Sequence, residues 1–284
     1  MLPIEPSFLT WFGRHRADFD ALVFDIDGVL MTSGRPIPGS VEVLQRLRAE
    51  GVPFSLLTND GSHSIPQKVA FLERLGFALH PEEITSCSDG LVEIVREQQR
   101  AGQLMFILGD LGVPCYAEQA GLRTTRDLRL LPECDGVIVG EAHYDWEPAI
   151  NGVLNHLLRH PNHPLLVPNP DEYYPGPDGT IIIAAGGVAR FIAKTLEVYG
   201  IKLEPNYLGK PYQPIFNHQH AELEKRLGRS LPRRRILMLG DSLASDIRGA
   251  KEFGYRAGLL LTGITREQHL PSAPVRPDHI FRGF

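Results

Sequence analysis

The sequence predicts an α/β fold built on a doubly wound parallel sheet. Short apolar runs, typical of buried strands, alternate along the chain with amphipathic stretches of helical period. Several of the apolar runs end in polar residues, and open α/β sheets bind ligands just outside the carboxyl ends of their strands. The chain has 284 residues, which suggests about two domains at ~150 residues each.

The stretch from Ala21 to Leu30 is the one around which the chain is organised. An apolar run is followed by Asp25 and Asp27, and Gly28 allows a sharp turn where the chain leaves the sheet. Two carboxylates at a strand end repel each other unless a cation or a proton is present. We interpret the stretch as a Mg²⁺ site with a carboxylate nucleophile. The alternative is an ordinary turn with two solvated aspartates.

The first domain is expected to continue as β-α-β-α-β. Residues 1–19 are predicted to be irregular, with Phe8, Trp11 and Phe12 packing on the domain surface. The spacing of apolar residues predicts helices over 41–49 and 69–75 and strands over 52–57 and 84–87. The strand over 52–57 again ends in polar residues, which are Thr58, Asn59 and Asp60.

The middle of the chain is expected to form an inserted second domain with its own small α/β core. Its pattern predicts strands over 104–108, 137–139 and 165–167 and helices over 91–99, 113–121, 146–158 and 187–199, with a proline-rich loop after residue 167. We therefore place the domain boundaries at 1–87, 88–205 and 206–284.

The last part of the chain is predicted to return to the first sheet. A short strand at 207–208 leads into Gly209-Lys210-Pro211, and a helix follows over 214–227. The strand over 236–239 ends in Gly240-Asp241, and a helix over 244–253 and a strand over 257–262 complete the core.

Composition excludes several classes of function. The net charge of −5 gives no basic field that would favour a nucleic acid polymer or an anionic membrane as a partner. No apolar stretch approaches the ~18 residues that span a bilayer, and the N-terminus lacks the apolar segment of a secretory signal. Three cysteines without a CxxC pair indicate a reducing compartment, so we expect a cytoplasmic protein.

Four predicted strand ends carry polar groups with complementary roles. They are Asp25 with Asp27, Thr58 with Asn59, Lys210, and Asp241. In a parallel sheet such ends lie at one edge. Carboxylates, a hydroxyl and an ammonium group are close to the minimum set for phosphoryl transfer, which needs positioning of the phosphoryl group and neutralisation of its charge. Mg²⁺ prefers carboxylate and water oxygens and bridges readily to phosphate.

The segments FDIDGVL, LLTND, LGKP and MLGDSLASDI resemble the four motifs of the haloacid dehalogenase (HAD) superfamily of aspartate-nucleophile hydrolases. The inserted segment resembles the C2-type α/β cap of class II, subfamily IIA, which includes NagD-like phosphatases. The features that carry this resemblance are the VIVG strand, the NPD-x-x-YP loop at 169–175 and the Ala-Gly-Gly at 185–187. The resemblance implies a Rossmann-like HAD core with an inserted cap.

The resemblance also implies catalytic roles. Asp25 corresponds to the nucleophile that forms an aspartyl-phosphate, and Asp27 to the general acid and then the general base. Mg²⁺ is expected to bind the side chains of Asp25 and Asp241 and the backbone carbonyl of Asp27. Asp246, at a helical offset from Ser242, is expected to orient Lys210 or a metal-bound water molecule, so that these two residues act on the site through its direct ligands.

The phosphate-binding residues implied by the resemblance are Thr58, the backbone N–H of Asn59, and Lys210. Many class II members have Asn or Ser where this chain has Asp60. Because an inward-facing acid would repel phosphate, we expect Asp60 to face away or to cap the following helix.

An acid at position 27 favours a phosphatase, because dehalogenases of the superfamily lack it. We expect Mg²⁺-dependent hydrolysis of a small phosphomonoester, such as a sugar phosphate or a nucleotide. A phospho-ligand-binding protein with little turnover and a phosphotransferase to an acceptor other than water remain alternatives. The expected partners are a small phosphorylated metabolite and a second copy of the chain through the cap.

The sequence does not identify the substrate. Candidates for substrate recognition in the cap are Asn169, Asp171, Tyr173, Tyr174 and His143. The clustered histidines at 156, 160 and 163 are expected to be surface or helix-face residues, because no Cys or acid lies at metal-ligand spacing from them.

Overall fold

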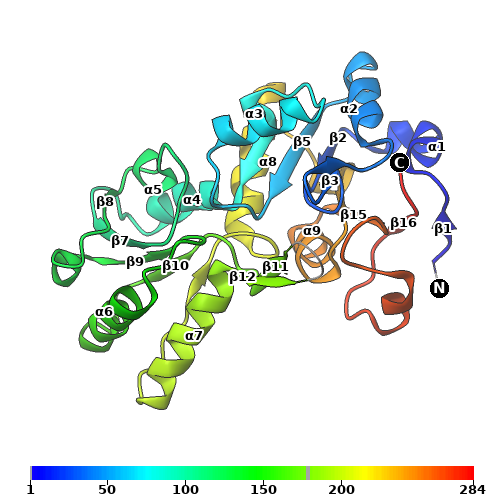
Figure 1. Ribbon diagram of the computed structural model, residues 1–284. Helices are drawn as coiled ribbons and strands as arrows, with labels where there is room; N and C mark the ends of the chain where they lie inside the picture. Colours follow the sequence, from blue (N-terminus) through cyan, green and yellow to red (C-terminus); the bar gives the residue numbers. More distant parts are fainter. Residues whose placement is uncertain (1, 177–179) are drawn as a thin grey trace. The chain divides into compact units, whose positions relative to one another are not determined.

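The computed structural model describes residues 2–176 and 180–284 (Figure 1). The chain divides into two compact units, which we describe separately. The core unit contains the residues up to Thr58, then Ile65–Thr85 and Gln219–Phe284, and the insert unit contains Asn59–Ser64 and Ser86–His218. The domain boundaries given above stay a prediction.

The core unit is built on a seven-stranded parallel sheet in the order β1-β16-β15-β14-β2-β5-β6. The strands are β1 (Ile4–Glu5), β2 (Ala21–Phe24), β5 (Phe54–Thr58), β6 (Ile84–Ser86), β14 (Ile236–Gly240), β15 (Arg256–Leu260) and β16 (His279–Phe281). From β2 the chain winds outward through β5 and β6, and from β14 it winds the other way. The predicted doubly wound sheet is therefore confirmed, and its switch point lies between β2 and β14.

Helices and one short hairpin complete the core unit. The hairpin consists of β3 (Met31–Thr32) and β4 (Arg35–Pro36), and the helices are α1 (Phe8–His15), α2 (Ser40–Ala49), α3 (Ile65–Arg74) and α9 (Arg248–Phe253), together with the part of α8 (Gln213–Leu227) that begins at Gln219. One face of the sheet, with Phe24 and Leu239, packs against apolar side chains of α1, α2 and α3. Burial of this apolar surface is the main stabilisation of the sheet.

We expect an irregular N-terminal segment from the sequence, but the structure shows regular elements there. The segment forms β1 and the two-turn helix α1, and Phe8, Trp11 and Phe12 are buried in the core cluster. The ring of Phe8 stacks on Phe12 with centroids 5.3 Å apart. The i, i+3, i+4 spacing of these aromatic residues places them on one face of the helix, which explains why they are buried rather than on the surface.

The insert unit contains a five-stranded parallel sheet in the order β13-β10-β9-β7-β8. The strands are β7 (Leu104–Leu108), β8 (Arg123–Thr125), β9 (Gly136–Val139), β10 (Leu165–Val167) and β13 (Asn206–Tyr207). The longer helices α6 (Trp146–Arg159) and α7 (Ala185–Val198) pack together on one face, and α4 (Gly90–Glu97) and the single-turn α5 (Tyr116–Gln119) lie on the other (Figure 1). The helix predicted over 113–121 is reduced to α5.

The proline-rich segment after β10 is not entirely a loop. It contains β11 (Tyr173–Pro175), which pairs antiparallel with β12 (Ile181–Ile183). The side chains of Tyr173, Tyr174 and the three isoleucines of β12 are exposed. Among the described residues, no helix has both the length and the apolar character needed to cross a bilayer.

Candidate active site

Three buried aspartates come together at the switch point of the core sheet. Asp25 directly follows β2, Asp241 directly follows β14, and Asp246 lies in the π-helical turn η7 (Leu243–Ile247). One carboxylate oxygen from each lies within 4.8 Å of the other two. Within residues 2–176 and 180–284, this is the one group of three or more His, Cys, Asp or Glu side chains arranged to hold a metal ion. An all-oxygen donor set of this kind suits Mg²⁺.

Backbone amides fix the directions of these carboxylates. The Oδ2 of Asp246 accepts hydrogen bonds from the N–H of Asp241 (3.1 Å) and of Ser242 (3.0 Å). The Oδ2 of Asp241 accepts one from the N–H of Ile264 at 2.5 Å. The hydroxyl of Ser242 accepts from the N–H of Ser245 at 3.2 Å and so caps η7. Asp246 thus fixes the backbone around Asp241, and the roles predicted for Asp246 and Ser242 stay predictions.

Two glycines leave room for Asp241. Gly28 has a φ of +79°, and a Cβ built there would lie 2.3 Å from Oδ2 of Asp241. A Cβ on Gly263 would lie 1.9 Å from the same atom. Since real Cβ atoms do not approach an oxygen so closely, any side chain at either position would displace the carboxylate. The glycine of the DxDG motif is therefore needed for space as well as for its backbone conformation.

Asp27 and Thr58, like Asp25, lie at or just beyond the carboxyl ends of the paired strands β2 and β5. Asp27 follows Asp25 by two residues and is exposed, so its carboxyl group can exchange protons with solvent. Thr58 is the last residue of β5, which pairs with β2, and its side chain is buried. The roles of these two residues and of the Asp27 carbonyl stay predictions.

Asn59 and Lys210 belong to the insert unit and are joined by two hydrogen bonds through the side-chain amide of Asn59. The Oδ1 of Asn59 accepts a hydrogen bond from the N–H of Lys210 at 2.8 Å, and its Nδ2 donates to the carbonyl of Lys210 at 3.0 Å. The same Nδ2 donates to Oδ2 of Asp171 at 3.1 Å. Lys210 is 1% exposed. The structure therefore brings together three of the predicted site residues, through the side chain of Asn59.

A second network in the insert unit contains Glu141, which sequence reasoning missed. The Nδ2 of Asn169 donates to one oxygen of Glu141 at 2.6 Å, and the N–H of Ala185 donates to the other at 3.2 Å. The Oδ1 of Asn169 in turn accepts from the N–H of Asp171 at 2.9 Å. Burial raises the pKa of Glu141 to about 7. The hydrogen bond from Asn169 favours the charged form and so acts in the opposite direction on this pKa.

The signal for Glu141 was present in the sequence. It is the second residue after β9 and follows Gly140, whereas Asp25 and Asp241 each directly follow a strand. Because a single acid after a strand is common in turns, this pattern alone did not distinguish Glu141.

The other substrate-recognition candidates lie elsewhere in the insert unit. The Nδ1 of His143 is 2.5 Å from Oδ2 of Asp110, and the His143 side chain is 82% exposed. Tyr173 and Tyr174 are exposed on β11. The structure therefore groups Asn169 and Asp171 with Asn59 but places His143 against Asp110.

Asp60 caps the turn before α3. Its Oδ1 accepts hydrogen bonds from the N–H of Ser62 (2.9 Å) and of His63 (3.3 Å), two residues before the helix begins at Ile65. This agrees with the expectation that Asp60 serves the following helix.

Comparison with known proteins gives the family. A family model described as haloacid dehalogenase-like hydrolase matches residues 22–123, and one described as HAD-hydrolase-like matches residues 207–284. A dihydroxyacetone phosphatase from Corynebacterium glutamicum is 30% identical over 264 residues, which cover 90% of this chain and 86% of the relative. The chain belongs to the haloacid dehalogenase-like hydrolases.

Solved structures agree with this assignment. A possible sugar phosphatase of the HAD superfamily from Cytophaga hutchinsonii is 27% identical, with a TM-score of 0.81 over 100% of this chain and 98% of the other. A glycerol phosphate phosphatase from Mycobacterium tuberculosis, solved in complex with magnesium, has the same fold (22% identity, TM-score 0.78, 93% of this chain and 74% of the other). The predictions of the HAD fold, of subfamily IIA and of a phosphatase-class hydrolase are confirmed.

Replacement of Gly28 by alanine tests whether the close approach to Asp241 matters. We expect Gly28→Ala to weaken Mg²⁺ binding by about tenfold or more, because the new Cβ displaces a carboxylate of the metal site. The measurement is Mg²⁺ affinity by calorimetry. Gly34→Ala is the matched control, since Gly34 also has a positive φ (+72°) but a Cβ added there would have nothing within 4 Å. Equal Mg²⁺ affinities of the two variants would contradict the prediction.

Proposed function

We propose that this protein is a Mg²⁺-dependent phosphatase that hydrolyses a small phosphomonoester through an aspartyl-phosphate on Asp25. The observation that carries the proposal is the group of three buried carboxylates at the switch point, with oxygens within 4.8 Å of one another. Without a cation their mutual repulsion would oppose folding, whereas a bound Mg²⁺ would turn them into a phosphate-binding site. The magnesium complex of the mycobacterial relative supports this choice of ion.

The chemistry divides between two aspartates. The carboxylate of Asp25 attacks phosphorus, and the bond between phosphorus and the leaving oxygen breaks while Asp27 gives that oxygen a proton. Asp27, now deprotonated, takes a proton from a water molecule that attacks the aspartyl-phosphate, and inorganic phosphate and free Asp25 result. The exposure of Asp27 supports this role, because the leaving oxygen and the attacking water must each reach its carboxyl group. Mg²⁺ would supply neutralisation of charge on the phosphoryl oxygens.

Three groups are proposed to hold the phosphoryl oxygens. They are the hydroxyl of Thr58, the backbone N–H of Asn59 and the ammonium group of Lys210. The two hydrogen bonds from the Asn59 side chain to the backbone of Lys210 support this assignment, since they fix the residue that carries the positive charge.

The substrate is proposed to be a small phosphorylated metabolite, as the names of the relatives suggest for those proteins. Asn169 and Asp171 are the insert-unit residues that we propose to contact its leaving group, because Asp171 is hydrogen-bonded to Asn59. A cytoplasmic location and a homodimer through the insert unit remain part of the proposal. The three cysteines, all without a disulfide, agree with a reducing compartment.

Asp25→Asn tests the nucleophile. We expect it to reduce turnover of p-nitrophenyl phosphate by about ten thousandfold or more, because the amide cannot form the phosphoenzyme. EDTA should abolish the wild-type activity, and added Mg²⁺ should restore it. Asp18→Asn, a change on an exposed carboxylate, is the control that should keep wild-type turnover. Wild-type activity in Asp25→Asn would overturn the mechanism.

Asp27→Asn separates the two half-reactions. p-Nitrophenolate leaves without a proton, so the variant should still release about one equivalent of it in a burst and then turn over slowly, because the water lacks its base. An alkyl phosphate such as glycerol phosphate needs the proton, so we expect its turnover to fall by about a hundredfold to ten thousandfold with no burst. Stopped-flow absorbance measures the burst of p-nitrophenolate, and phosphate release measures turnover of the alkyl phosphate. Equal losses in the burst and in steady-state turnover would refute the assignment of Asp27.

Asp171→Ala tests substrate recognition in the insert unit. If Asp171 contacts the leaving group, the variant should change the order of kcat/KM across a panel of phosphorylated metabolites. Turnover of p-nitrophenyl phosphate should survive, because Asn59 keeps both of its hydrogen bonds to Lys210. Tyr174→Phe provides a comparison at an exposed position of β11. An unchanged order of substrates in Asp171→Ala removes this residue from the recognition site.

A further inference from the structure

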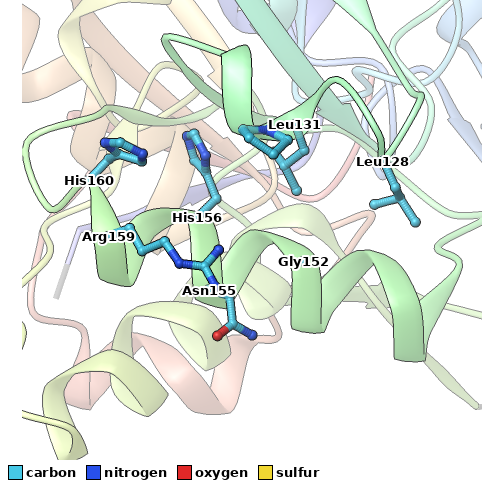
Figure 2. A pocket seen from close by; sticks show the side chains of 8 residues that line it. Leu128, Leu131, Gly152, Asn155, His156, Arg159 and His160 are labelled. Atoms are coloured by element: carbon cyan, nitrogen blue, oxygen red, sulfur yellow. The ribbon is translucent and has the colours of Figure 1, made fainter.

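The insert unit contains a pocket of about 210 Å³ that the proposed reaction does not use (Figure 2). It lies between α6 and the preceding segment that carries Leu128 and Leu131. The rings of His156 and His160 lie at one end of the pocket and Leu128 at the other (Figure 2). One end of the pocket is therefore apolar, and the other carries two imidazole rings.

His156 has a buried nitrogen without a hydrogen-bond partner. The residue is 3% exposed, and its Nδ1 is one of the few buried side-chain atoms in the described part of the chain that make no hydrogen bond. Its other nitrogen, Nε2, is 3.2 Å from Nδ1 of His163. A buried polar atom left unpaired costs about 1–3 kcal/mol, so its presence needs a reason.

The hydrogen bond between His156 and His163 limits the forms that His156 can take. A bond between two imidazole nitrogens joins the N–H of one ring to the lone pair of the other. We infer that Nε2–H of His156 donates and that Nδ1 of His163 accepts, because the opposite arrangement would leave a buried N–H at Nδ1 of His156 without an acceptor. The unpartnered Nδ1 of His156 then carries a lone pair. An N–H held on one nitrogen with a lone pair on the other is the usual state of a metal-ligating histidine.

His160 places a second imidazole beside the first. It comes four residues after His156 and directly follows the last residue of α6, where its N–H donates to the carbonyl of His156 at 2.9 Å, and the two ring centroids are 5.0 Å apart. His160 is half-buried and lines the pocket, and its ring also stacks on that of His163 with centroids 4.7 Å apart. Two histidines at i and i+4 on a helix are a known arrangement of zinc ligands.

We propose that Nδ1 of His156 and the ring of His160 bind a borderline divalent transition-metal ion, with Zn²⁺ as the representative, and that His163 is the residue that positions His156. Water or a small anionic ligand in the pocket would complete the coordination. This site is separate from the carboxylates around Asp25, which offer only oxygen ligands.

Charges around the pocket bear on which ion binds. Burial and the neighbouring histidines lower the pKa of His156 to about 4, so the ring is neutral and available as a ligand at pH 7. Arg159 also lines the pocket but is exposed, so its guanidinium can extend into solvent. Its positive charge disfavours ions held only by electrostatics, such as Mg²⁺, and favours an anionic co-ligand on an ion bound through nitrogen.

The test is a Zn²⁺ titration by calorimetry in the presence of excess Mg²⁺, which occupies the carboxylate site. Wild-type protein and the control His269→Ala, at an exposed histidine of the core unit, should bind Zn²⁺ equally. His160→Ala should lose that binding. His163→Ala should bind about tenfold more weakly, and His163→Gln, whose amide oxygen can accept from His156, should recover much of the loss.

Nitrogen NMR of the histidine rings gives an independent readout of the ligand atoms. Zn²⁺ should shift the Nδ1 resonance of His156 and a ring nitrogen of His160, with no matching change at His269. The half-buried His160 makes His160→Ala the decisive variant, because His156→Ala would also remove a core side chain. The proposal is wrong if His160→Ala binds Zn²⁺ as the wild type does, or if the Zn²⁺-induced shifts appear only at other histidines.

Discussion

Repulsion among three buried carboxylates is the constraint on which the core unit depends. Two unit charges 4.8 Å apart repel by about 3.5 kcal/mol at an effective dielectric of 20, and there are three such pairs. Parallel pairing of β2 with β14, with Phe24 opposite Leu239, brings the strand ends that carry Asp25 and Asp241 side by side. Four backbone N–H groups, those of Ile26, Asp241, Ser242 and Ile264, offset part of the repulsion. A divalent cation among the carboxylates would reduce it further, and the absence of a Cβ at Gly28 and Gly263 leaves room for Asp241 in this arrangement.

The side chain of Asn59 performs a similar task in the insert unit. Its amide contacts both the N–H and the carbonyl of Lys210, as a neighbouring strand would, so the backbone of that lysine is held at two points. Gly209 has no room for a side chain, since a Cβ there would lie 2.6 Å from the carbonyl oxygen of Pro168. A charged residue whose backbone is fixed in this way loses little backbone conformational entropy when it binds an anion. Such preorganisation is what electrostatic catalysis requires.

The sequence predicted the parts of the fold that local patterns encode. The strands that end at Asp25 and Asp241 were found because an apolar run, an acid and a glycine are neighbours in the chain. The environment of Glu141 could not be found in this way, because its partners Asn169 and Ala185 lie 28 and 44 residues further along the chain. The pairing of β11 with β12 also depends on a partner strand. Helix α1 needs no distant partner to be predicted, since the spacing of its buried aromatic residues is visible in the sequence. The prediction of an irregular segment there is wrong because it does not use that spacing.

Burial has opposite consequences for the two kinds of side chain that we propose as metal ligands. Removing carboxylates such as Asp25 from water destabilises their charge, so a cation that restores neutrality gains affinity, and hard oxygen ligands favour Mg²⁺. Removing the imidazole of His156 from water keeps it neutral, so it can ligate without first losing a proton, and nitrogen ligands favour ions such as Zn²⁺. The same physical effect can therefore sort two ions between an oxygen site and a nitrogen site. Ligand chemistry, rather than overall charge, would decide which ion each site holds.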